Sequence, residues 1–323
     1  MIGTAATGDI MRLDMMKKPK KRIVVLLSFI VILMLTALPA HAEEFCPPAK
    51  PLPNLTGNYR EDLISVCNSQ LGYVEAESGN SIYAAWAGQA GRAWCSEFVA
   101  WCARKAGISK TIIPTGTSSK KYMEVFSGQG RLFIPEGNAN NCICRNYTAK
   151  TISFTDIKRG DIIFTETDGN YSNGPDHTAL VLSNEGDKLS VINGNSHNSV
   201  RITSCSKEKI HCLARPCYEK AACAASVIKT KLRIRNVRIS RRKIRVIYTG
   251  IKDKYARYQI AYRLAGSYKW ITKTTAAKSI QLTKLKPGRK YIIRVRAFCK
   301  VSNNVEDMEF GSWSKVRTIK TKK

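Results

Sequence analysis

Cys95 is the residue whose type and position best suit nucleophilic chemistry. A thiol attacks an acyl carbon only as its thiolate, and a helix N-terminus favours the thiolate because unpaired N–H groups and the helix dipole stabilise negative charge. Apolar residues at helical spacing predict a helix over 94–105, which places Cys95 at its start. A structural or disulfide-bonded cysteine is the alternative, but Cys102 lies about 10 Å further along that helix, beyond disulfide reach. We expect Cys95 to be the nucleophile and Cys102 to be a core residue.

A cysteine nucleophile also needs a base, and His177 is the best placed of the histidines. It opens an apolar run, so its side chain is expected at the edge of a sheet. His197 and His211 fall in polar, cysteine-rich stretches and are expected at the surface. The base needs an acceptor that fixes its tautomer, a role that Asp, Glu or Asn fills. The next strand ends in a turn that offers two amides, Asn193 and Asn195, although Asn-Gly-Asn alone is ordinary turn chemistry.

The elements that must position these residues are helices followed by short strands. Apolar positions at helical spacing predict a further helix from Tyr59 to Val74, weakened at its end by Gly72. Beyond Lys158, β-like runs are separated by Gly, Asn and Asp turns. These runs lie at 161–165, 178–183, 189–192 and 200–203. Helices first and strands afterwards are typical of an α+β domain.

Six sequence blocks occur in the order seen in CHAP domains, and residues 58–204 resemble that family. The blocks are Leu71-Gly72-Tyr73, Tyr83 to Trp86, Ala93 to Ala103, Gly160-Asp161-Ile162-Ile163-Phe164, His177-Thr178-Ala179-Leu180-Val181 and Ile192-Asn193-Gly194-Asn195. The resemblance implies a papain-like fold with N-terminal helices packed on an antiparallel sheet. It also implies the cysteine amidase or endopeptidase chemistry by which CHAP domains cut bacterial peptidoglycan.

The same resemblance implies roles for individual residues. Cys95 would be the nucleophile and His177 the general base, while Asn193 falls on the position that usually carries glutamate. A neutral amide orients imidazole but stabilises its cation less than a carboxylate would, although papain-like enzymes work with Asn in that role. Asn195 matches a second polar position that helps to align His177. No metal or cofactor is expected, and we predict substrate contacts for three aromatic residues of these blocks, Tyr83, Trp86 and Trp94.

Residues 1–42 are typical of an export signal. A basic cluster at 17–22 precedes an apolar run over 23–38 that ends in Ala40-His41-Ala42. We expect cleavage after Ala42; a retained anchor is the alternative, since the run approaches the roughly 17–25 residues that span a bilayer. Four prolines make 43–57 a stiff, extended leader. The protein is therefore expected to be secreted, extracellular or bound to the cell wall, and to touch membrane only through its signal.

The formal net charge of +29 is concentrated in the last third of the chain. Residues 224–323 hold 28 Lys and Arg against 4 Asp and Glu, whereas residues 43–223 hold 19 against 18. From Lys231 onward apolar and basic residues alternate, which predicts a small all-β domain. A strong positive field concentrates a protein on polyanions, and we expect anionic wall polymers as partners.

Residues 228–323 resemble a bacterial fibronectin type III domain, an immunoglobulin-like sandwich. Tyr291 would be the corner tyrosine of such sandwiches, and Tyr248 departs from the pattern because a core tryptophan is commoner there. The alternative role is a spacer whose lysines only solubilise it. Specific nucleic-acid recognition is not expected, since the aromatic residues fit a sandwich and export removes the protein from intracellular nucleic acid. The matching blocks are 244–248, 258–262, 285–291, 294–297 and 311–314.

Cysteines are many for a chain of this length, 11 in 323 residues. Zinc sites usually show tight Cys-x2–4-Cys pairs, and the segment 205–227 has only one gap of that length. We therefore interpret this segment as a cysteine-rich connector with disulfides, whose pairing cannot be deduced from the spacing. Its cysteines are Cys205, Cys212, Cys217 and Cys223. Cys142 and Cys144 fall in a segment, 139–157, without a CHAP counterpart, which we interpret as a substrate-shaping insertion.

These features predict a secreted peptidoglycan hydrolase with a basic, wall-retaining module. It would be an N-acetylmuramoyl-L-alanine amidase or a stem or cross-bridge endopeptidase, and the sequence leaves the bond open. The main alternative is a catalytically silent wall-binding or adhesion protein that keeps the CHAP fold as a scaffold; the intact Cys95 and His177 argue against it. A wall peptidase of the NlpC type would also use Cys and His, but usually with a third histidine.

Overall fold

A computed structural model describes residues 46–76, 80–116, 118–138, 147–170, 172–302, 304 and 306–323. The predicted export signal at 1–42 lies outside these residues, and so do Cys142 and Cys144. Within the described ranges, no helix combines the length and the apolar character needed to cross a bilayer. The leader from Cys46 to Gly57 contains neither helix nor strand. Its end is held to helix α3 (Tyr59–Ser69) by the Asp62 carboxylate, which accepts hydrogen bonds from the amides of Thr56 and Gly57 at 2.8 Å each.

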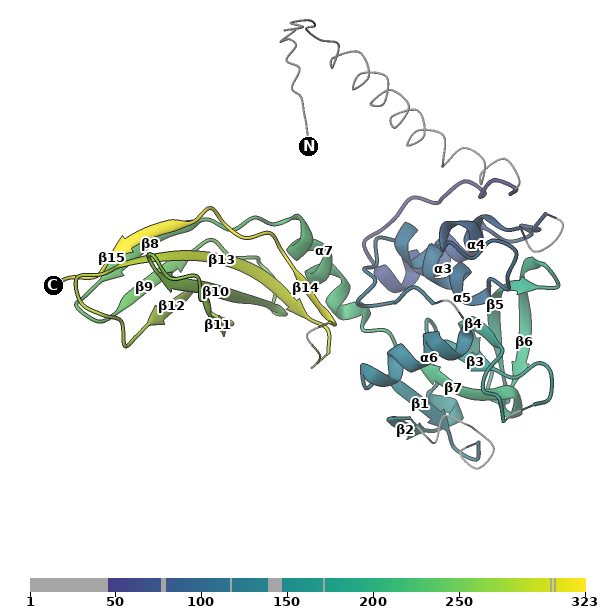
Figure 1. Ribbon diagram of the computed structural model, residues 1–323. Coiled ribbons are helices and arrows are strands. Elements are labelled where there is room, and N and C mark those ends of the chain that lie inside the picture. Colours follow the sequence, from purple (N-terminus) through teal and green to yellow (C-terminus); the bar gives the residue numbers. More distant parts are fainter. Residues whose placement is uncertain are drawn as a thin grey trace, which may run out of the picture. The chain divides into compact units, whose positions relative to one another are not determined.

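Among its described residues, the N-terminal domain places four helices before a seven-stranded sheet (Figure 1). The helices are α3 (Tyr59–Ser69), α4 (Ile82–Trp86), α5 (Cys95–Lys105) and α6 (Ser119–Gly128). The strands are β1 (Leu132–Pro135), β2 (Ala149–Ile152), β3 (Ile162–Thr165), β4 (His177–Asn184), β5 (Lys188–Ser196), β6 (Ser199–Ser206) and β7 (Ile210–Ala214). Their order in the sheet is β2-β1-β7-β3-β4-β5-β6, antiparallel except for the parallel pair β1–β2.

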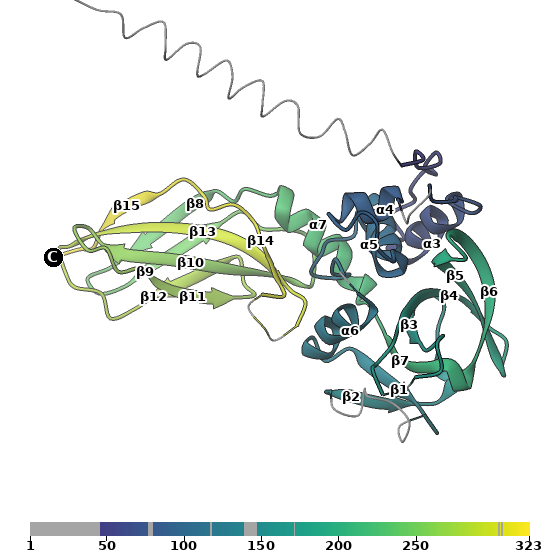
Figure 2. The same ribbon diagram turned by 45° about the vertical axis from the view of Figure 1, so that its right-hand side comes forward.

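Helix α5 is the central helix of this domain because nearly all of its residues are buried. It packs on β4 and β5 and also contacts α3, α4 and α6 (Figure 2). Gly194 of β5 permits the close approach, since a Cβ there would lie 2.7 Å from Cγ of Phe98. Helix α3 ends at Ser69 rather than at the predicted Val74; the chain turns at Gly72, whose φ of +72° lies in the left-handed region that favours glycine.

The predicted connector at 205–227 is wrong in two respects. First, β7 lies inside the sheet, between β1 and β3, so residues 210–214 belong to the N-terminal domain. Helix α7 (Ala221–Lys229) follows it, after a short 3-10 turn at Tyr218–Lys220. Second, no disulfide joins the cysteines of the described residues. The cysteines of this segment cannot form one stapled cluster because they sit on β6, on β7, before the 3-10 turn and on α7.

The C-terminal domain is a sandwich of two antiparallel sheets. One sheet has the order β12-β9-β8, formed by β8 (Ile234–Ile239), β9 (Ile244–Tyr248) and β12 (Ser279–Leu282). The other has the order β11-β10-β13-β14, with β15 also paired to β13. Its strands are β10 (Ala256–Leu264), β11 (Ile271–Thr275), β13 (Lys290–Lys300), β14 (Met308–Phe310) and β15 (Arg317–Lys320).

Two tyrosines anchor this sandwich. The hydroxyl of Tyr291 accepts a 2.8 Å hydrogen bond from the amide of Lys286, which confirms the predicted corner tyrosine. Tyr248 takes the place expected for a tryptophan: it is 3% exposed, packs on the ring of Tyr258 and donates to the carbonyl of Ala277 at 2.8 Å. Tyr248 therefore fixes the register of strand β9 with a ring that is smaller than that of tryptophan and that ends in a hydroxyl.

Candidate active site

Cys95 is the first residue of α5, as predicted, and its side chain lies in the interior. Trp94 precedes the helix with φ −128° and ψ 24° and makes no side-chain cap, so the first N–H groups of α5 have no side-chain acceptor from that position. The Cys95 residue is 4% exposed. Its sulfur therefore experiences the helix dipole with little screening by water, which is the setting that activates a thiol.

The other two predicted groups, the imidazole of His177 and the amide of Asn193, lie together. The imidazole Nε2 lies 3.0 Å from Oδ1 of Asn193. The amide of Asn193 is oriented by its other end, because its Nδ2 donates to the hydroxyl of Thr203 at 2.8 Å and to the carbonyl of Arg201 at 3.3 Å. With Oδ1 as acceptor, the histidine must carry its proton on Nε2, which leaves Nδ1 to face the Cys95 thiol.

The thiol and the imidazole lie close enough to shift each other's pKa. Burial disfavours the thiolate, but the hydrogen bond and positive charge of His177 outweigh it and lower the pKa of Cys95 below its ordinary value. Burial likewise disfavours the imidazolium, yet the hydrogen bond and negative charge of Cys95, with smaller contributions from Asn193 and Asp176, raise the pKa of His177. Both shifts favour a thiolate–imidazolium pair.

Glu97 is the group whose negative charge opposes this pair. It is 1% exposed, and burial raises the pKa of its carboxyl. One carboxyl oxygen accepts from the Ser96 hydroxyl at 2.9 Å, while Oε1 has no hydrogen-bond partner among the described residues. A raised pKa keeps more of the Glu97 carboxyl neutral, which reduces its repulsion of the thiolate.

Ser119 is a site residue that the sequence did not reveal. Its hydroxyl lies 3.4 Å from the Cys95 sulfur and accepts a 2.8 Å hydrogen bond from Thr178, the neighbour of His177. Because Thr178 is the donor in that bond, the single hydrogen of Ser119 is free to point at the sulfur. Ser119 is also the first residue of α6, so two helix N-termini converge on the thiol.

The other predicted site residues have mixed outcomes. Tyr83 and Trp94 are fully buried and stack on each other, with ring centroids 5.0 Å apart, so their predicted contact with substrate is wrong: these rings fill the core. Trp86 is 40% exposed and keeps a surface on which a substrate could pack. Asn195 is half-buried, and its side chain makes no hydrogen bond to His177 within the described part of the chain. His211, expected at the surface, is buried in β7 and pairs with Glu166 at 3.2 Å.

A hollow of about 310 Å³ adjoins the histidine side of the site. Its lining includes His177, Asn193 and Asn195 from the site, and His197 and Lys209 from the turns around it. Cys95 does not line it, so the hollow opens beside the base rather than over the nucleophile. Asn195 therefore belongs to the surroundings of the base and not to its hydrogen-bonding chain.

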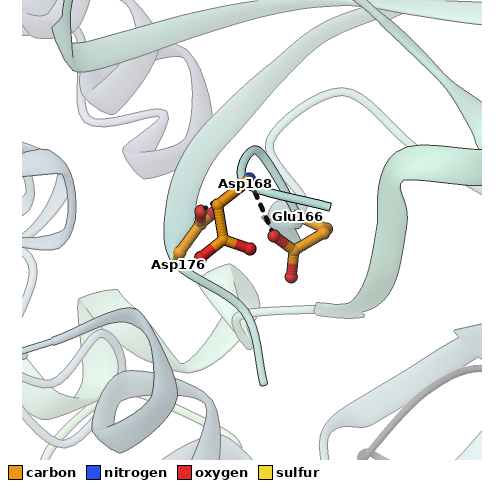
Figure 3. Close-up of side chains that lie close together, drawn as sticks. All are labelled: Glu166, Asp168 and Asp176. Atoms are coloured by element: carbon orange, nitrogen blue, oxygen red, sulfur yellow. Dashed lines mark hydrogen bonds between the residues drawn. The ribbon is translucent and has the colours of Figure 1, made fainter. Parts of the chain in front are cut away.

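Three carboxylates gather where β3 leads toward β4. Glu166, Asp168 and Asp176 bring one oxygen each within 4.8 Å of one another (Figure 3). Carboxylate oxygens are ligands that Ca²⁺ and Mg²⁺ accept. Here the oxygens already accept hydrogen bonds from the loop backbone, including the amide of Asp168 to Glu166 at 2.8 Å and the amide of Thr167 to Asp176 at 3.0 Å. The cluster orders the loop that leads into His177.

Comparisons with known proteins bear on the C-terminal domain. No curated protein matches the chain. A solved myokine structure is 16% identical with a TM-score of 0.23 and covers 27% of this chain and 92% of that one. The solution structures of the fn3 domain of human contactin 1 are 26% identical with a TM-score of 0.22, over 27% of this chain and 73% of that one. The family model for the fibronectin type III domain matches residues 231–307. Residues 231–307 therefore form a fibronectin type III domain.

Proposed function

We propose that the protein is a secreted cysteine hydrolase that cleaves an amide bond of peptidoglycan. The observation that carries the proposal is that His177 interacts with Cys95 on one side and with Asn193 on the other, with the thiol at the start of a buried helix. A nucleophile, a base and an acceptor that orients the base are the parts that thiol-dependent acyl transfer needs. The CHAP resemblance of residues 58–204 supplies the substrate class and remains a prediction.

In the first half of the reaction, the Cys95 thiolate attacks the amide carbonyl carbon. The negative charge that forms on the carbonyl oxygen is held by backbone N–H groups at the start of α5, where the helix leaves them without intrahelical partners. His177, as imidazolium, then gives its proton to the leaving amine, and a thioester joins the acyl group to Cys95. The C–N bond breaks in this step.

In the second half, water replaces the amine. Neutral His177 removes a proton from water, the hydroxide attacks the thioester, and the thiolate leaves with the carboxylic acid as product. Asn193 keeps the ring in the orientation and tautomer that both halves require, since its own amide is held by Thr203 and Arg201. The cycle returns the proton to His177 and consumes one water.

The basic domain supports a wall location. Lys and Arg outnumber Asp and Glu by 24 in residues 224–323, and a positive field of that strength attracts polyanions. We infer that this domain retains the enzyme among the anionic polymers of the wall, while the N-terminal domain acts on the peptide bonds there. Export depends on the predicted signal at 1–42.

The test compares the full mature chain with its Cys95→Ala variant on Gram-positive sacculi, with released termini identified by mass spectrometry. The matched control is Cys46→Ala, because Cys46 is a half-buried cysteine of the leader and does not line the hollow beside His177. New amine and carboxyl ends from wild type and the control, but not from Cys95→Ala, are expected and would identify the bond. Intact sacculi that bind all three proteins would instead favour the silent wall-binding scaffold.

A further inference from the structure

Two strands of the fibronectin type III domain carry an ordered row of arginines on their outer face. Alternate residues of a strand point to opposite faces, and Ile293, Val295 and Ala297 of β13 are fully buried. Arg294 and Arg296, between them, therefore lie on the face away from the core. Arg263 is on the adjacent strand β10, which pairs with β13 along its whole length (Figure 2).

Aromatic rings separate these guanidinium groups and complete a stack that we call the arginine ladder. Its members, in order, are Arg263, Trp270, Arg294, Trp313, Arg296 and Phe310. The Cζ atom of Arg294 lies 4.3 Å from the ring centroids of both tryptophans. Arg296 lies 4.4 Å from the centroid of Trp313 and 3.9 Å from that of Phe310. Cation–π contacts at these distances hold the guanidinium planes in fixed orientations.

The positive charge of the ladder is not neutralised within the domain. None of its arginines forms a salt bridge with a described carboxylate. Arg294 donates no hydrogen bond to any described residue, and its Nε is buried without a partner. Burial, together with the charge of Arg294, lowers the pKa of Arg296. Cations held close together without a counterion form a site that gains by binding an anion.

A basic hollow continues the same face beyond Phe310. It encloses about 490 Å³ and is lined by Arg257 and Lys300 as well as by Gln259, Phe298 and Phe310. Gln259 also accepts a 2.8 Å hydrogen bond from Nε of Arg296, so the hollow and the ladder share their border. Aromatic walls next to cationic groups suit a chain in which charged and uncharged units alternate.

We propose that the arginine ladder and this hollow bind a phosphodiester-linked polymer of the cell wall. The proposal rests on the wall-retention role given above and names the surface that performs it. Guanidinium groups bind phosphate oxygens through directed, charge-assisted hydrogen bonds, and their orientation here is fixed by the rings. The surface therefore differs from the domain's other lysines and arginines in geometry, not only in charge.

The test measures binding of soluble poly(glycerol phosphate) to the full mature chain carrying Cys95→Ala, which separates retention from hydrolysis. One variant is Arg257→Gln with Lys300→Gln, which removes two charges at the hollow and leaves the ladder intact. The matched control is Arg235→Gln with Arg238→Gln, since these two exposed arginines lie on β8 of the opposite sheet. A third variant, Arg294→Gln with Arg296→Gln, tests the ladder, with its fold checked by circular dichroism.

We expect the hollow variant to bind the polymer about tenfold more weakly. The slope of log K against log salt concentration should become shallower by about 1.4, because two phosphate contacts are lost. The control should change binding by less than about twofold. Equal weakening in variant and control would overturn the proposal, because binding would then depend only on total charge. No binding by the parent chain would overturn it as well. A third result would also overturn it: a single-stranded oligothymidylate with the same number of phosphates that binds more than about tenfold tighter than poly(glycerol phosphate).

Discussion

Replacing Ser119 by alanine should make the Cys95 thiolate harder to form. The Ser119 hydroxyl lies 3.4 Å from the sulfur and has its hydrogen available, since it accepts from Thr178. A hydrogen bond to a charged group contributes about 1.5–3 kcal/mol, and we take the lower end because sulfur is a weak acceptor at this distance. About 1.4 kcal/mol corresponds to a tenfold change in the thiolate fraction.

The assay is alkylation of Cys95 by iodoacetamide, a neutral electrophile, followed by peptide mass spectrometry across a pH series. The pKa of Cys95 is lowered from its ordinary value of 9.0, so the midpoint of the wild-type rate profile should lie below that pH. In Ser119→Ala the rate should be about tenfold lower on the acid side of the profile and unchanged at the plateau, where every thiol is ionised. His177→Ala should shift the profile to higher pH in the same sense.

The matched control is Ser127→Ala on the same helix, whose hydroxyl contacts the carbonyl of Thr148 and not the thiol. Removing Ser119 also leaves the buried hydroxyl of Thr178 without its acceptor, so the double variant with Thr178→Val separates a loss of stability from a loss of thiolate. The reasoning is refuted if the Ser119→Ala and Ser127→Ala profiles superimpose on that of wild type.

Two further predictions concern the scaffold. Gly194→Ala would set a Cβ 2.7 Å from Cγ of Phe98 and 2.9 Å from Cζ3 of Trp94. We therefore expect the free energy of unfolding to fall by about 1–3 kcal/mol and the melting temperature by about 5 °C, as measured by calorimetry. The control is Gly128→Ala, whose added Cβ would meet nothing. Tyr291→Phe removes the acceptor of the Lys286 amide at a cost of about 1 kcal/mol, so the amides of β13 should exchange about fivefold faster. Tyr268→Phe, at a side chain that is 95% exposed, should leave that exchange unchanged.

Cys95 and His177 could be found from the sequence because their signals are local. Each stands at the start of an apolar run whose period indicates one helix or one strand, and the structure begins α5 and β4 at these two residues. Ser119 carries no such signal, because it lies 24 residues from Cys95 in the sequence and on a helix whose residues match no motif. A polar residue at a helix start is ordinary capping chemistry until the tertiary fold shows what it faces.

Burial is the property that could be predicted least well from the sequence. His211 stands among charged residues and cysteines, yet β7 lies between β1 and β3, and the Glu166 carboxylate provides the partner that a buried histidine needs. Tyr83 and Trp94 have the polar ends that suit a binding surface, but they meet in the core beneath α5. The arginine ladder also depends on register, since only the pairing of β10 with β13 aligns Arg263 with the arginines of β13.

The amide at Asn193, which stands where the proposed CHAP relationship would place a glutamate, fits its immediate surroundings. Its Nδ2 faces the carbonyl oxygen of Arg201, which can only accept a hydrogen bond, so a carboxylate at this position would place two acceptors against each other. An amide stabilises imidazolium less than a carboxylate would, and the charge of Asp176 makes a further, small contribution to the raised pKa of His177. Ser119 acts on the other partner by stabilising the thiolate. The ion pair is thus stabilised at both ends without a carboxylate directly behind the histidine.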